Sequence, residues 1–116
     1  MTNSDSSIHE KVQYLVSKIG LTLLALSVGV RDRGTLSKSE GSLDEVLTEE
    51  NKLRVDVLFD VWSTVSDSEG DDTARAWLIG ANPWLNEESA VTVIRDGDFH
   101  KVRVAACAMV DGATSF

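Results

Sequence analysis

The sequence predicts an all-α protein, and three observations indicate this fold class. Apolar residues recur every three or four positions along much of the chain, glycines follow several of these runs, and the only proline is Pro83. This spacing is typical of amphipathic helices, and glycine often follows the last residue of a helix. With 116 residues, 42% of them hydrophobic, the chain has the length of one domain and can bury a core.

Three helices are expected in the first part of the chain. Apolar residues at helical spacing predict a helix over 8–19, a short run predicts a second over 21–28, and a third over 33–40 is mostly polar. A glycine follows each of the three, at positions 20, 29 and 41. Residues 1–7 are polar and precede the first apolar residue, so we expect a disordered N-terminus.

A long apolar helix is expected next within residues 48–70, with Thr48 as its N-cap and apolar residues from Leu53 to Val65. Two glutamates follow the threonine in the first turn, where carboxylates interact favourably with the helix dipole. The helix is apolar on more than one face, which leaves two interpretations open. It is either the central helix of the monomer or part of a symmetric homodimer contact. Its apolar residues are Leu53, Val55, Val57, Leu58, Phe59, Val61, Trp62 and Val65.

The last part of the chain predicts three more helices. Two aspartates, Asp71 and Asp72, are expected to cap a helix over 73–79, and Ala81-Asn82-Pro83 is expected to form a turn. Ser89 is expected to cap a helix over 90–96 that ends at a glycine; this stretch also has strand propensity, but the cap and the glycine favour a helix. A final helix is expected over 99–111, capped by an aspartate at position 98.

Charge is distributed unevenly along the chain. The formal net charge is −8, and residues 48–116 contain six basic and thirteen acidic residues, a net charge of −7. This half is not expected to bind a polyanion, whereas the first half is compatible with DNA. No apolar run approaches the ~20 residues of a membrane span, and the N-terminus lacks a secretory signal. One cysteine cannot form an internal disulfide, so we expect a cytoplasmic protein without membrane association.

No combination of residues indicates an enzyme. His9 and His100 have no partner at metal-ligand spacing and are expected to be surface histidines, and Cys107 is expected to be a small buried thiol. Neighbouring acidic residues near helix starts are explained by capping and by the helix dipole. The sequence has no glycine-rich phosphate-binding motif. We therefore expect no catalytic residue, no metal site and no cofactor.

The residues around Gly29 have the spacing of a helix-turn-helix. Ala25 is small enough to let a second helix approach, and Gly29, four residues later, permits the turn. The segment that follows is the most basic short stretch of the chain, with short polar residues suited to base edges and cations suited to phosphates. An ordinary helical corner with a solvated face is the alternative. The predicted DNA-binding residues are Arg31, Arg33, Thr35, Ser37 and Lys38.

A more specific pattern lies in the second half. Trp77 is followed by Asn82-Pro83 and Leu85, then by a short helix that ends at Gly97 and an alanine-rich helix that ends before Gly112. In this order, and with the helix-turn-helix spacing before them, these residues resemble the Xre/MbcA/ParS antitoxin family over about residues 12–112. The resemblance implies an antitoxin that neutralises a RES-domain toxin, an NAD-consuming enzyme, and that represses its own operon.

The motif residues have a physical role of their own. A tryptophan is a large core anchor, and an Asn-Pro pair fixes a tight turn, so we expect these residues to shape the domain without contacting a partner. The structural residues are Ala25, Gly29, Trp77, Asn82, Pro83, Leu85 and Gly97.

The partner contacts are implied by the same resemblance. In that family the C-terminal end of the antitoxin reaches toward the NAD pocket of the toxin. Gly112 would end the last helix, and Phe116 would be the anchor of a short tail over 113–116. Arg95, Asp96 and Asp98 would lie on the rim, and a frayed terminus without a role is the alternative for the tail.

The expected organisation is an N-terminal Xre-like helix-turn-helix packed with a small C-terminal helical toxin-binding bundle. Its parts are a disordered N-terminus (1–7), a helix-turn-helix region (8–47), a connecting core helix (48–70), a toxin-binding domain (71–112) and a tail (113–116). The expected partners are a RES-domain toxin, operator DNA and a second copy of the chain. Family members often carry a tryptophan near the end of the recognition helix, where this chain has Ser39-Glu40-Gly41. A stand-alone DNA-binding regulator without a toxin is the alternative function.

Overall fold

The computed structural model describes residues 4–29 and 48–111, which form helices and no strand, so the predicted all-α class is confirmed. An isolated bridge pairs Asn82 with Glu88. The elements are α1 (Ser4–Ile19), α2 (Leu21–Val28), α5 (Glu49–Glu69), α6 (Asp71–Ile79), the 3₁₀ turn η1 (Pro83–Leu85), α7 (Ala90–Asp96) and α8 (Phe99–Asp111).

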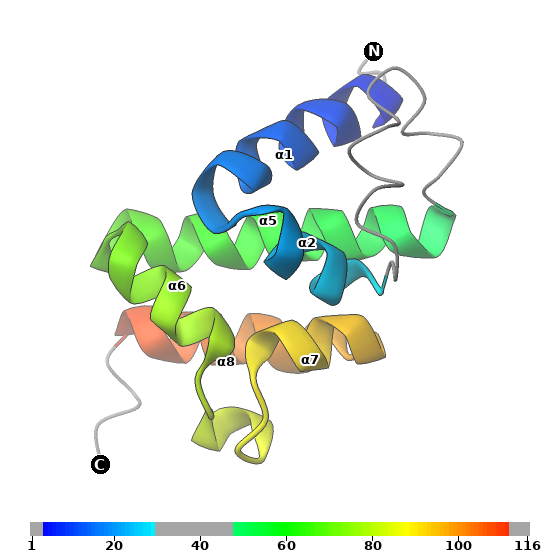
Figure 1. Cartoon of the computed structure of the whole chain (residues 1–116). Helices are drawn as coiled ribbons and strands as arrows, with labels where there is room; N and C mark the ends of the chain where they lie inside the picture. Colours follow the sequence, from blue (N-terminus) through cyan, green and yellow to red (C-terminus); the bar gives the residue numbers. More distant parts are fainter. Residues whose placement is uncertain (1–3, 30–47, 112–116) are drawn as a thin grey trace.

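Helix α5 is the centre of the molecule. It contacts α1, α2, α6, α7 and α8, and Figure 1 shows it crossing the middle of the fold, with α1 above it and α7 and α8 below it in that view. Six of its apolar residues are buried, Trp62 and Leu58 completely. Leu53 is 52% exposed and Phe59 is half-buried, so most of the apolar surface of this helix is used inside the monomer.

The predicted caps of two helices are confirmed. The Thr48 hydroxyl accepts a hydrogen bond from the backbone N–H of Asn51 at 3.1 Å, and the Ser89 hydroxyl accepts one from Thr92 at 3.2 Å. Each bond satisfies a first-turn N–H that has no partner within the helix. The predicted helix over 21–28 and its end at Gly29, which has a positive φ of 85°, are also confirmed.

Two predicted helix starts are wrong. α1 begins at Ser4, inside the segment expected to be disordered, because the helix continues through polar residues beyond its apolar stripe. In α6, Asp71 and Asp72 lie in the first turn and do not cap it; the N-cap is Gly70, with φ 94° and ψ 161°. Carboxylates are also favourable in a first turn, where they face the positive end of the helix dipole. The predicted helix over 33–40 lies outside the described residues.

Candidate protein-binding site

The turn between α6 and α7 is organised by the Asn82 side chain. Its Oδ1 accepts a hydrogen bond from the Trp84 N–H at 2.9 Å, and its backbone oxygen accepts from Leu85 and Glu87, both at 2.8 Å. Pro83 is the first residue of η1, where its fixed φ fits the start of a helical turn. Asn82 is 5% exposed, Leu85 is fully buried and Trp77 is 9% exposed. These residues therefore lie in the core and the turn, as their types predict.

A two-residue connection joins α7 to α8. Gly97 has φ 88° and ψ 11°, and its N–H donates to the oxygens of Ile94 and Val93. The Asp98 N–H donates to the Val93 oxygen at 3.2 Å, which completes the pattern of a glycine-ended helix. The side chains on either side of this glycine, Arg95, Asp96 and Asp98, are all exposed. The three predicted rim residues are thus brought together on one tight turn.

Arg54 of α5 holds this turn from beneath. Its Nε donates to the backbone oxygens of Arg95 at 3.0 Å and Ile94 at 3.3 Å, and one terminal nitrogen donates to Asn51 at 3.0 Å. The side chain is only 13% exposed. A cation at a helix C-terminus interacts favourably with the partial negative charge there. Sequence reasoning missed this role; the available signal was a lone arginine between two apolar residues of the α5 stripe.

The outer surface of α8 continues from the same turn. His100, Arg103, Val104 and Cys107 are exposed, and Val104 is an apolar side chain that is 41% exposed. Cys107 was expected to be buried, and this expectation is wrong. Its alanine neighbours at 106 and 108 face the core, which leaves the position between them toward solvent. The turn and this helix face together form an exposed surface with both charged and apolar side chains.

The predicted DNA-binding side is described only in part. Ala25 is buried at 3% exposure, and Gly29 ends α2 in the left-handed conformation. Arg31, Arg33, Thr35, Ser37 and Lys38 lie outside the described residues, as do Gly112 and Phe116. A Cβ placed on Gly29 would lie 3.6 Å from Cγ of Arg95. The end of α2 therefore meets the end of α7, where the rim residues begin.

A shallow groove lies between α1 and α5. It has a volume of about 520 Å³ and is lined by Glu10, Lys11, Tyr14 and Phe59. The Lys11 Nζ lies 5.2 Å from the centre of the Phe59 ring and 2.7 Å from Oδ1 of Asp56. The lysine therefore already lies over the aromatic ring that lines the groove.

Neither a metal site nor a membrane-spanning helix was found in the part of the chain that the structure describes. Within it, no group of three or more His, Cys, Asp or Glu side chains is placed to hold a metal ion. None of its helices is both long and apolar enough to cross a bilayer. Comparison of the chain with models of known protein families, with curated proteins and with solved structures found no match.

Proposed function

We propose that this protein is an antitoxin-like protein that binds and neutralises a RES-domain NAD-consuming toxin. The contact surface is the α7–α8 turn, the outer face of α8 and the residues that follow it. The proposal rests on the resemblance of the sequence to the Xre/MbcA/ParS antitoxin family and on one structural observation. Arg95, Asp96 and Asp98 are exposed on a turn whose backbone oxygens are bound by Arg54, a side chain that is 13% exposed.

The fixed turn favours binding because its backbone already has one conformation before a partner docks. An immobilised surface loses less conformational entropy when a partner docks. Two backbone oxygens of the turn are bound by Arg54, and the glycine of the turn already has the conformation that it needs. This arrangement favours a surface that meets a protein partner over a cavity that holds a small molecule.

Charge supports a basic partner. Residues 48–116 carry a net charge of −7, and the turn exposes two carboxylates, Asp96 and Asp98, beside one cation, Arg95. A cleft built to bind a dinucleotide diphosphate is basic, so a chain with a net negative charge is attracted to it. Charges on the rim of such a contact mainly raise the rate of association and select the partner.

Co-expression tests the proposal directly. The chain is expressed together with a RES-domain toxin, and growth and cellular NAD are measured. We expect the wild-type chain to restore both, and the double variant Asp96→Lys/Asp98→Lys to restore them poorly. The matched control, Asp67→Lys/Glu69→Lys, reverses two exposed carboxylates at the far end of α5 and should behave as wild type. Failure of the wild-type chain to protect the cells contradicts the proposal.

Deletion of residues 113–116 tests the contribution of the tail. By the resemblance, the tail blocks access of substrate to the toxin, so the truncated chain should keep its fold and lose neutralisation. If the truncated chain protects the cells equally well, the contact lies instead on the helical surface from Ser89 to Val110.

Operator binding is a second candidate function, favoured by the buried Ala25 and the left-handed Gly29 at the end of α2. We expect the chain to bind DNA from upstream of its own reading frame, measured by fluorescence anisotropy between about 50 and 200 mM salt. Replacing Arg33 and Lys38 by alanine should weaken binding and flatten the salt dependence. Binding to DNA without any toxin partner would favour the stand-alone regulator. Absence of binding, alone and with the toxin, contradicts this second function.

A further inference from the structure

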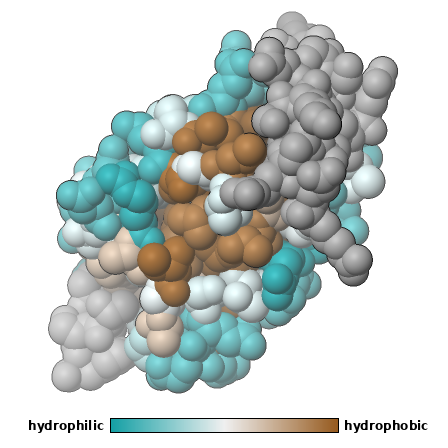
Figure 2. Space-filling model, viewed as in Figure 1, coloured by the Kyte–Doolittle hydropathy of each residue, from teal (hydrophilic) through white to brown (hydrophobic). Residues whose placement is uncertain are grey.

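We draw no further inference here: the strongest candidate, the apolar surface patch over helix α2 (Figure 2), where Leu26 is 46% exposed, carries no proposal because nothing in the described part of the chain shows what covers it.

Discussion

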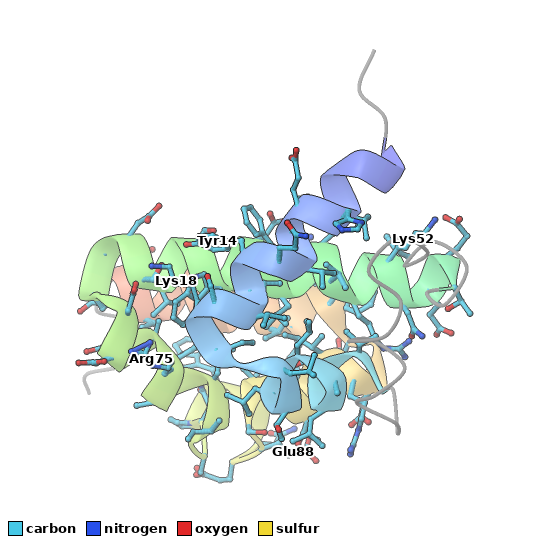
Figure 3. The ribbon with its side chains drawn as sticks, turned by 45° about the horizontal axis from the view of Figure 1, so that its top comes forward. Tyr14, Lys18, Lys52, Arg75 and Glu88 are labelled. Atoms are coloured by element: carbon cyan, nitrogen blue, oxygen red, sulfur yellow. The ribbon has the colours of Figure 1, made fainter. Side chains whose placement is uncertain are left out.

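The junction between α1 and α2 and the junction between α7 and α8 use the same parts. In each, a glycine with positive φ follows the first helix, and an arginine from another helix binds a backbone oxygen near its end. Arg54 donates to two oxygens of α7, and its side chain is 13% exposed. Arg75 donates to one backbone oxygen of α1, that of Lys18 at 3.2 Å (Figure 3), and to the Asp72 carboxylate at 2.7 Å, and its side chain is 39% exposed. The more buried arginine holds the junction that carries the candidate rim.

The two glycines also differ in backbone conformation. Gly97 has ψ 11°, in the left-handed helical region that asparagine also adopts. Gly20 has φ 90° and ψ 158°, a region that is essentially restricted to glycine. The first junction thus depends on the glycine itself, and the second depends more on the arginine beneath it.

The largest effect is expected from Arg54→Met. This change removes the hydrogen bonds of the guanidinium to the backbone oxygens of Ile94 and Arg95 and to the side chains of Asn51 and Glu50, at a cost of about 2 kcal/mol. Arg75→Met should cost less than about 1 kcal/mol, because exposed charged contacts contribute little. Urea unfolding followed by circular dichroism measures both, and equal losses in the two variants would remove the distinction between the junctions.

Replacing Gly20 and Gly97 by asparagine should affect the stability of the two junctions differently. Gly20→Asn forces an L-residue into a conformation that it avoids, at a cost of about 1–3 kcal/mol. Gly97→Asn should lower stability by less than about 1 kcal/mol, because asparagine tolerates the left-handed region and a Cβ there has its closest neighbour, Arg54, at 3.8 Å. Thermal unfolding of the two variants measures these losses. A larger loss for Gly97→Asn than for Gly20→Asn would contradict this prediction.

Two buried tryptophans, Trp62 and Trp77, differ in whether the indole N–H has a hydrogen-bond partner. Trp62 is fully buried and donates to the Tyr14 hydroxyl of α1 at 3.3 Å, whereas the Trp77 N–H of the C-terminal unit is buried without a partner. Tyr14→Phe should cost about 1–2 kcal/mol because it leaves the buried N–H of Trp62 without its hydrogen-bond partner. Trp77→Phe removes an unpaired donor and should change stability by less than about 1 kcal/mol. Chemical denaturation gives the free energy of unfolding of each variant, and an equal loss in the two variants would contradict the prediction.

The smallest effect is expected at alkaline pH. Lys18 donates to Asp71 at 3.0 Å, and this hydrogen bond raises the pKa of the lysine above its ordinary value of 10.5. A raised folded-state pKa stabilises the fold fully below that ordinary value, and the contribution disappears as the pH rises through the higher folded value. Lys18→Met should therefore lose less stability than wild type on the alkaline side of pH 10.5. Equal losses in the two proteins would show that the bond contributes nothing.

Local signals predicted most helix ends, because capping is a short-range interaction. Thr48 and Ser89 cap the helices that they were expected to cap, and Gly29 and Gly97 end the helices before them. The start of α1 was missed because polar residues without an apolar stripe carry no periodic signal. The cap of α6 was misplaced because aspartate suits both the N-cap and the first turn.

Long-range contacts could not be predicted in the same way. Arg54 and the oxygens that it binds are about forty positions apart, and no local pattern links them. The exposure of Leu26 and Cys107 depends on which neighbouring helix covers which face, and a mostly apolar helix gives no directional signal. The rim residues were expected from a family resemblance, and the structure places the three that it describes, Arg95, Asp96 and Asp98, on one exposed turn.

The most direct test of the proposed function is the affinity of the purified chain for a RES-domain toxin, measured by isothermal titration calorimetry. Reversal of Asp96 and Asp98 to lysine should weaken binding by at least tenfold, ~1.4 kcal/mol, while reversal of Asp67 and Glu69 leaves it unchanged. The charge-dependent part of the loss should shrink at higher salt. Equal affinity for wild type and the rim variant, or no binding by the wild-type chain, would contradict a partner surface at the α7–α8 turn.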